Sequence, residues 1–123
     1  MAPEDPEFDV VVAGSGAAGM TAALTAASQG LSVVVIEKTA HFGGSTARSG
    51  GGLWVPGNAV LNRAGVRDSP ERASTYLAHV AGDCVAPERQ RALLEHGPAM
   101  LDLVRAATPV DFAWVPNYAD YYP

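Results

Sequence analysis

Two short apolar runs flank an alanine-rich stretch near the start of the chain. The runs cover Phe8 to Ala13 and Leu31 to Ile36, and each contains three consecutive valines. Continuous apolar runs of this kind are typical of parallel strands that are buried on both faces. Between them, Ala17 to Gln29 places apolar residues at helical spacing, and Gly30 follows as a C-terminal cap. The order strand, helix, strand predicts a βαβ unit over residues 8–37.

A glycine-rich stretch over residues 42–57 follows the second run. It contains Gly43, Gly44 and Gly50 to Gly52, interspersed with small hydroxyl residues. Such a segment cannot form a core of its own, so we expect irregular backbone that is held in place by something else.

Helices are predicted over residues 58–107, beginning with a short one from Asn58 to Ala64. Ser69 and Pro70 supply an N-cap and a first helical residue for the next helix.

Pro87 opens another predicted helix, which we expect to end at His96 because Gly97-Pro98 interrupts it. A separate helix is then expected to run to Ala107. Val110 to Val115 alternates loosely between apolar and polar residues and predicts a strand. It lies in segment 108–123, the expected start of a substrate site.

Composition and charge narrow the classes of function. Apolar residues make up 48% of the 123-residue chain, charged residues make up 17%, and the formal net charge is -5. This balance is ordinary for a globular core, and the scattered Lys and Arg residues argue against a nucleic-acid partner. No stretch approaches the roughly 18 apolar residues of a membrane-spanning helix, so we expect no transmembrane segment.

The N-terminus and the cysteine content bear on the compartment. Residues 1–7 are acidic and broken by proline, unlike a secretory signal, and we expect a disordered leader there. Cys84 is the only cysteine, which excludes an internal disulfide and favours the reducing cytoplasm. No spacing of Cys, His or acidic residues is typical of a metal site, so no bound metal is predicted.

A glycine motif joins the first apolar run to the predicted helix. Gly14-Ser15-Gly16-Ala17-Ala18-Gly19 matches G-x-G-x-x-G, with a strand before it and a helix after it. In this motif Gly14 allows the sharp turn, Gly16 lets a pyrophosphate approach the backbone, and Gly19 lets the helix pack closely on the strand. The free N–H groups and the dipole at the helix start favour phosphates. The sequence therefore predicts a dinucleotide-binding turn.

Glu37, at the end of the second apolar run, supports this interpretation. A carboxylate there can accept hydrogen bonds from the ribose hydroxyls of an adenosine, and it would repel the 2′-phosphate of NADP. The alternative is a tight glycine turn with a solvated glutamate. Strand, motif, helix, strand and acid in this order favour the dinucleotide site.

The second glycine-rich segment favours FAD over NAD. Phe42-Gly43-Gly44-Ser45-Thr46 follows soon after Glu37 and can run beside the pyrophosphate towards a flavin ring. Backbone N–H groups and small hydroxyls are suitable donors to the ring, and the lack of side chains leaves space for it. The alternative for this segment is a flexible surface loop.

At these segments the sequence resembles the FAD-binding front end of the fumarate reductase and succinate dehydrogenase flavoprotein superfamily. The similar residues are Val11 to Gly19, Glu37-Lys38 and Gly43 to Gly52. Further segments resemble the 3-ketosteroid Δ1-dehydrogenases within that superfamily, namely Leu53 to Asn58, Ala64 to Ser69 and Pro116 to Pro123.

The resemblance implies an FAD-dependent enzyme that inserts a double bond between C1 and C2 of a 3-ketosteroid. A tyrosine base would take a proton from C2, and flavin N5 would take a hydride from C1. Tyr121 matches the catalytic tyrosine that hydrogen-bonds this base. The base and a keto-polarising tyrosine lie far downstream in the family, so we expect this chain alone to be inactive.

The motif and the resemblance together indicate one set of cofactor-binding residues. These are Gly14, Ser15, Gly16, Ala17, Ala18, Gly19, Glu37, Lys38, Gly43, Gly44, Ser45, Thr46, Ser49, Gly50, Gly51 and Gly52.

The expected fold class is α/β, as the N-terminal part of a Rossmann-like FAD-binding domain over residues 8–123. A doubly wound sheet needs more strands than these, so we expect the remainder of a longer polypeptide to be missing. Two other functions stay open: an FAD-dependent dehydrogenase with a non-steroid substrate, such as a fumarate-reductase-like enzyme, and a non-enzymatic dinucleotide-binding module.

Overall fold

A computed structural model describes residues 6–118 of the chain. Two compact units, Met1–Leu53 and Trp54–Pro123, are considered separately below as the N-terminal and C-terminal units. Most of the expected leader at 1–7 and the candidate catalytic residue Tyr121 lie outside the described residues.

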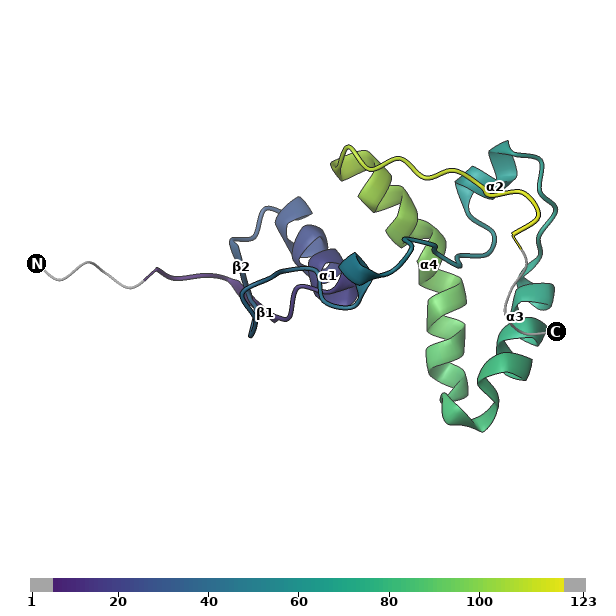
Figure 1. The fold of residues 1–123 in the computed structure, drawn as a ribbon, viewed down its shortest axis with the longest axis horizontal. Helices are drawn as coiled ribbons and strands as arrows, with labels where there is room; N and C mark the ends of the chain where they lie inside the picture. The colour runs from purple at the N-terminus through teal and green to yellow at the C-terminus, as the bar shows by residue number, and fades with distance from the viewer. Residues whose placement is uncertain (1–5, 119–123) are drawn as a thin grey trace, which may run out of the picture. The chain divides into compact units, whose positions relative to one another are not determined.

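The N-terminal unit contains the predicted βαβ arrangement (Figure 1). Strand β1 (Val10–Ala13) pairs in parallel with β2 (Val33–Ile36), in a register that sets Val10 against Val33. Helix α1 (Ala17–Ser28) connects the strands and contacts both of them. The βαβ prediction is therefore confirmed, with each strand somewhat shorter than its apolar run.

The prediction that these strands are buried on both faces is wrong for the residues described. Along β1 the side chains alternate between half-buried and exposed, and Val11 is 61% exposed. Val12 lies on the side of α1, because a Cβ at Gly19 of that helix would stand 3.3 Å from its Cγ1. Within the N-terminal unit, helix α1 covers one face of the two-stranded ladder, and Val11 on the other face is exposed.

Glycine ends α1 as expected. The N–H of Gly30 donates to the carbonyl of Ala27 at 3.0 Å, and the N–H of Leu31 donates to that of Ala26 at 3.3 Å. Gly30 has a φ of +85°, a conformation that glycine adopts without strain. This reversal carries the chain from the helix into β2.

The C-terminal unit is helical. Its described α-helices are α2 (Ala59–Arg63), α3 (Pro70–Ala81) and α4 (Pro87–Ala107), with a short 3-10 turn, η2 (Gly82–Cys84), between the last two. Helices α3 and α4 contact one another as a helical hairpin (Figure 1). The buried apolar side chains of the unit are Val55, Ala73 and Leu101.

Side-chain caps fix the start of two of these helices. Ser69 accepts a hydrogen bond from the N–H of Arg72 at 3.2 Å, and Pro70 follows at the first helical position. Asn58 accepts from the N–H groups of Val60 and Leu61 at 2.8 and 3.1 Å. Both caps lie where the sequence predicts a helix to begin.

The predicted break at Gly97-Pro98 is wrong, because α4 continues through it. A residue before proline normally avoids helical angles because its Cβ and N–H clash with the proline ring, and Gly97 lacks the Cβ. Gly97 is also buried, and a Cβ there would stand 3.2 Å from Cγ1 of Val55. The same glycine thus removes the Cβ part of the proline clash and lets α4 approach Val55.

The predicted strand at Val110 to Val115 is also wrong. The segment has no regular structure, and both end residues are exposed, by 48% and 59%. A strand needs a neighbouring strand for its N–H and C=O groups, and β1 and β2 are the only strands among residues 6–118.

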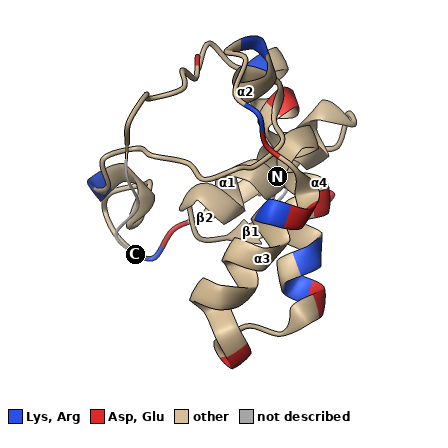
Figure 2. Ribbon diagram, turned by 90° about the vertical axis from the view of Figure 1, so that its right-hand side faces the viewer, with Lys and Arg blue, Asp and Glu red and all other residues tan. Residues whose placement is uncertain are grey.

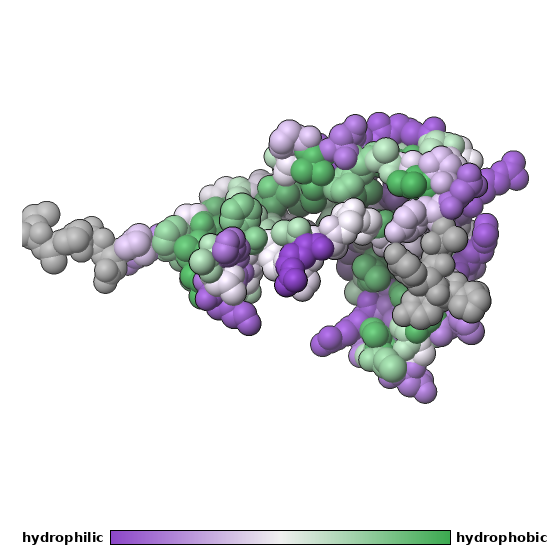
Figure 3. Space-filling model, in the orientation of Figure 1, coloured by the Kyte–Doolittle hydropathy of each residue, from purple (hydrophilic) through white to green (hydrophobic). Residues whose placement is uncertain are grey.

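The described surface is mixed in charge and rich in apolar groups. Acidic and basic residues are interleaved along α4 (Figure 2). Exposed apolar side chains gather over β1, β2 and α1 (Figure 3), among them Val11, Met20 and Ile36. Within residues 6–118, no helix is both long and apolar enough to cross a membrane.

Asn58→Ala is expected to destabilise the C-terminal unit by about 1–2 kcal/mol. The substitution removes a helix cap and a hydrogen bond from the buried Asn58 amide to the carbonyl of Val55. Urea unfolding followed by circular dichroism measures the loss. Asn62→Ala, at an exposed asparagine of α2, is the control and should leave the free energy of unfolding within about 0.5 kcal/mol. Equal effects of the two substitutions would contradict the capping role.

Candidate functional site

The turn between β1 and α1 depends on glycine at two positions for different reasons. Gly14 has a φ of +95°, and its N–H donates to the carbonyl of Ile36 at 2.8 Å. Gly19 permits close packing, because a Cβ there would stand 2.0 Å from the carbonyl oxygen of Gly14. A Cβ at Gly16 would meet no protein atom within 4 Å. The turn is therefore packed tightly on the protein side and open at Gly16.

Backbone N–H groups without a protein acceptor gather at this turn. Among the described residues, the amides of Gly16, Ala18 and Gly19 make no hydrogen bond. The amide of Ala17 donates to the hydroxyl of Thr46 at 3.1 Å. Free amides at a helix start, together with the helix dipole, create a positive potential that favours an anion.

The second glycine-rich segment lies beside this turn. A Cβ at Gly44 would stand 3.5 Å from Cα of Gly16. The N–H of Gly43 donates to the hydroxyl of Ser15 at 2.8 Å. The amides of Gly44, Ser45 and Thr46 likewise have no acceptor among residues 6–118. These contacts bring the two glycine segments together, as the FAD interpretation of the sequence requires.

Tight packing explains Gly43 in this loop. Its φ is +103°, and a Cβ there would stand 2.5 Å from the Cβ of Ala47. The 3-10 turn η1 (Thr46–Arg48) follows directly. Any larger residue at Gly43 would displace this turn, and with it the hydroxyl of Thr46.

Glu37 reaches the phosphate-binding turn through Ser15. Its Oε2 accepts from the N–H of Ser15 at 3.1 Å and from the Ser15 hydroxyl at 2.6 Å. Ser15 is 3% exposed, whereas Glu37 is half-buried. Hydrogen bonds to the ionised form, from Ser15 first and then from Thr39, lower the pKa of Glu37 from 4.5 to about 2. The carboxylate therefore stays charged at any physiological pH.

Thr39 is a contact of Glu37 that the sequence pattern did not reveal. Its N–H donates to Oε1 of Glu37 at 3.1 Å. Its hydroxyl lies 2.6 Å from the carbonyl of His41 and 3.2 Å from Oε1. A hydroxyl has one proton, and the shorter distance favours the carbonyl. The feature of the sequence that could have indicated this contact is a hydroxyl residue two positions after the acidic residue.

The remaining predicted cofactor residues have fewer contacts. Lys38 is exposed and makes no hydrogen bond or ion pair with the described part of the chain. Ser49 bonds locally, donating to the carbonyl of Thr46 at 2.8 Å and accepting from the N–H of Gly51 at 3.1 Å. Gly50 and Gly52 are exposed, and a Cβ at either would meet open space. The structure does not link these residues to the turn.

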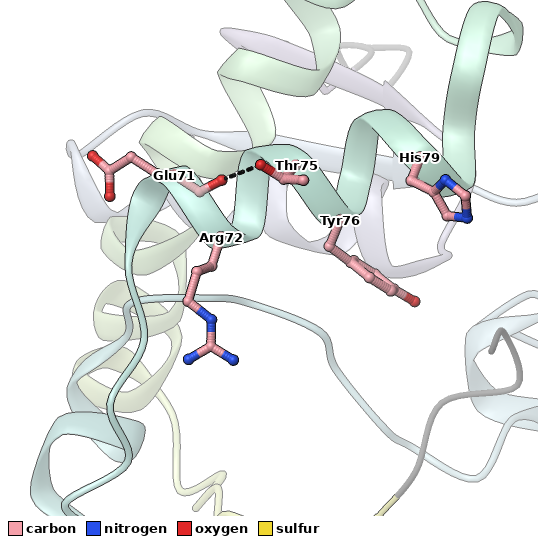
Figure 4. Close-up of a pocket in the computed structure, with 5 residues that line it drawn as sticks. All are labelled: Glu71, Arg72, Thr75, Tyr76 and His79. Carbon is pink, nitrogen blue, oxygen red and sulfur yellow. Dashed lines mark hydrogen bonds between the residues drawn. The ribbon is translucent and has the colours of Figure 1, made fainter.

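A hollow elsewhere in the fold lies over α3 in the C-terminal unit (Figure 4). Its lining residues all come from that helix: Glu71, Arg72, Thr75, Tyr76 and His79. The Tyr76 ring also lies 5.4 Å, centre to centre, from the ring of Trp54. None of the predicted site residues lines this hollow, so it is not the cofactor site that the motif predicts.

Comparison with known proteins identifies relatives over most of the chain. The family model described as "FAD binding domain" matches residues 9–119. A 3-oxosteroid 1-dehydrogenase of Mycobacterium tuberculosis is 63% identical over 117 residues, which are 95% of this chain and 21% of the relative. A 4-oxocyclohex-2-ene-1-carboxylate 5-dehydrogenase of Sinomonas cyclohexanicum is 49% identical, over 92% of this chain and 19% of the relative.

A solved structure is also similar to this chain. The 3-ketosteroid Δ1-dehydrogenase of Sterolibacterium denitrificans, in complex with 1,4-androstadiene-3,17-dione, is similar with a TM-score of 0.70 and 42% identity. The match covers 80% of this chain and 17% of that one. The chain thus spans about a fifth of the length of the relatives that it matches.

Glu37 is expected to make the stability of the chain depend on acid pH. Its pKa in the folded chain, about 2, lies below the ordinary 4.5, so folding favours the ionised form. The resulting stabilisation is complete above about pH 4.5 and is lost as the pH falls towards about 2. Glu37→Gln should remove this part of the pH dependence, measured by urea unfolding at a series of pH values.

Asp9 provides the internal reference for that experiment. Hydrogen bonds from Ser32 also lower the pKa of Asp9. The contribution of Asp9 to the pH dependence of stability is therefore present in the unaltered chain and in Glu37→Gln alike. An identical pH dependence with and without the Glu37 carboxylate would contradict the bonds assigned to it.

Proposed function

Because the chain belongs to the family of FAD binding domains, we propose that its two glycine-rich segments and Glu37 hold the adenosine and diphosphate part of FAD. The family match confirms FAD over NAD, and the resemblance to the 3-ketosteroid dehydrogenases is likewise confirmed. What we propose in addition is the role of each individual residue in holding FAD.

The open side of the turn at Gly16 is the observation that carries this proposal. Nothing in the fold of the described residues demands glycine there, since a Cβ would meet no protein atom within 4 Å. A bound group that approaches the main chain does demand it. The free amides of Ala18 and Gly19 beside it, and those of Gly44 and Ser45 across from it, are suited to diphosphate oxygens.

Glu37 and Thr46 would complete the site at either side of the diphosphate. The charged carboxylate of Glu37 is suited to accept hydrogen bonds from ribose hydroxyls. The Thr46 hydroxyl, which accepts from the amide of Ala17 at 3.1 Å, keeps the second segment against the start of α1. When bound, FAD would supply the redox chemistry, and the residues here bind and orient it.

For the whole protein we propose dehydrogenation of a 3-oxosteroid between C1 and C2. The support is the 63% identity to a 3-oxosteroid 1-dehydrogenase, against 49% to the dehydrogenase of a 4-oxocyclohexene carboxylate. Both relatives are named for an oxo compound, so a non-steroid cyclic ketone is the second candidate. Tyr121 is proposed to hydrogen-bond the catalytic base, by resemblance alone, because it lies outside the described residues.

Part of the substrate site is proposed to come from protein beyond these residues. The far face of the β1–β2 ladder and several large apolar side chains of the C-terminal unit, including Trp114 and Val115, are exposed. Groups of this kind are normally covered in a complete enzyme. The cytoplasm remains the proposed compartment, on the evidence of cysteine content.

Gly16→Ala and Gly19→Ala are expected to separate cofactor binding from folding. Gly16→Ala should leave the free energy of unfolding within about 1 kcal/mol and weaken FAD binding at least about 10-fold, because the new methyl group lies where the diphosphate approaches. Gly19→Ala should destabilise the free chain by about 2–4 kcal/mol, because its Cβ would overlap the Gly14 carbonyl.

Urea unfolding of the FAD-free chain and fluorescence titration with FAD measure the two quantities. A Gly16→Ala chain that binds FAD as tightly as the unaltered chain would count against the proposed diphosphate site. A colourless chain that takes up NADH instead of FAD would overturn the proposal for this site altogether.

Two chimaeric enzymes are expected to distinguish the substrate classes. In each, this chain replaces the matching segment of a relative, from Mycobacterium tuberculosis or from Sinomonas cyclohexanicum. The first should reduce a dye with a 3-ketosteroid within about 10-fold of its parent, because more contacts with the remainder are retained at 63% identity than at 49%. The chain alone should show no steroid-dependent reduction. If the chimaera with the Sinomonas cyclohexanicum relative retained more of its parent's activity than the first chimaera, the cyclic ketone would be favoured.

Tyr121→Phe in the steroid chimaera tests the proposed catalytic tyrosine. Loss of the hydroxyl should lower kcat at least about 10-fold with bound FAD unchanged. Tyr122→Phe, at the adjacent tyrosine, is the control and should leave kcat within about 3-fold. Equal losses in both variants would speak against a specific role for Tyr121.

A further inference from the structure

The Ser15 side chain faces Glu37 and not the open side of the turn. Its hydroxyl donates to Oε2 of Glu37 at 2.6 Å and accepts from the N–H of Gly43 at 2.8 Å. The N–H of Ser15 also donates to Oε2, at 3.1 Å. At 3% exposure, Ser15 is a buried residue that connects the turn to Glu37, 22 residues further along the chain, and to Gly43, 28 residues further along.

The hydrogen bonds differ between the two oxygens of Glu37. A carboxylate oxygen has two lone pairs, and both of those on Oε2 accept from Ser15. Oε1 accepts from the N–H of Thr39 at 3.1 Å and lies 3.2 Å from the Thr39 hydroxyl. That hydroxyl has one proton, and the carbonyl of His41, at 2.6 Å, is its nearer acceptor. One acceptor position therefore remains on Oε1.

From this geometry we infer that Ser15 is a positioning residue for FAD: it holds Oε2 so that Oε1 is presented to a ribose hydroxyl, and it ties Glu37 to the second glycine segment at Gly43. The inference rests on the proposed function and adds to it. The motif leaves the residue at this place open, so it does not require a hydroxyl.

A second serine in the same unit offers a matched control. At the opposite end of the β1–β2 ladder, the Ser32 hydroxyl donates to Oδ2 of Asp9 at 2.6 Å and accepts from the N–H of Asp9 at 3.0 Å. The N–H of Ser32 donates to the same oxygen at 2.8 Å. The chemistry matches that of Ser15 and Glu37, but Asp9 and Ser32 are exposed and make no hydrogen bond with a proposed FAD-binding residue within the described part of the chain.

The test is a double-mutant cycle on FAD affinity, measured by fluorescence titration of the 123-residue chain. Ser15→Ala should weaken FAD binding about 10- to 100-fold, as expected for hydrogen bonds to a charged group. If Ser15 acts through Glu37, Ser15→Ala should change the affinity less than about 3-fold in the Glu37→Gln background. Ser32→Ala should leave it within about 3-fold of the unaltered chain. Ser15→Cys, similar in size but a weak hydrogen-bonding partner, should reproduce the loss if the alanine variant unfolds.

A second measurement needs no FAD. In the free chain, Ser15→Ala should raise the pKa of Glu37 from about 2 towards its ordinary value, as followed by NMR of the side-chain carboxyl. An unchanged pKa, a fully multiplicative loss of affinity in the double variant, or unaltered FAD affinity in Ser15→Ala would each overturn the inference. Failure of the unaltered chain to bind FAD would instead overturn the proposed function, so the two failures are distinguishable.

Discussion

The close approach of α1 to the turn before it is the constraint on which the candidate site depends. Only glycine at position 19 allows it, since any Cβ there would overlap the carbonyl of Gly14. Once the helix starts at this point, its first amides cluster at Gly16 to Gly19, and the second glycine segment can lie against Gly16. The positive potential of the site is thus a consequence of packing, with no Lys or Arg in the turn.

Glu37 adds a negative charge beside the positive potential of the turn, and the hydrogen bonds from Ser15 stabilise the ionised carboxylate there. The carboxylate is held ionised, with its pKa at about 2, by donors that belong to the turn itself. A dinucleotide needs both signs of potential, donors for the diphosphate and an acceptor for the ribose. The chain supplies both within residues 14–46.

The sequence predicted the parts of the structure whose cause is local. Steric and hydrogen-bonding rules that act over a few residues account for Gly14 and Gly19, the ends of α1, and the caps at Asn58 and Ser69. The failures have longer-range causes. The Gly97-Pro98 pair predicts a break, but it lies in a continuous helix whose glycine packs on Val55. Helices α2 and α3 separate these two residues along the chain. Segment 110–115 has strand-like alternation, but no strand within residues 6–118 pairs with it.

The same distinction separates the two halves of the function. The cofactor side of the site is formed by one contiguous stretch, so a motif can predict it and 123 residues can contain it. The proposed substrate side would also need groups that the proposal places outside this stretch, and the chain spans about a fifth of the relatives that it matches. Exposed apolar groups such as Val11 and Trp114 are the kind of surface that we propose the remainder of the enzyme covers. FAD recognition is therefore the part of the proposed activity that this sequence encodes most directly, and the proposed choice of ketone is the part that it encodes least.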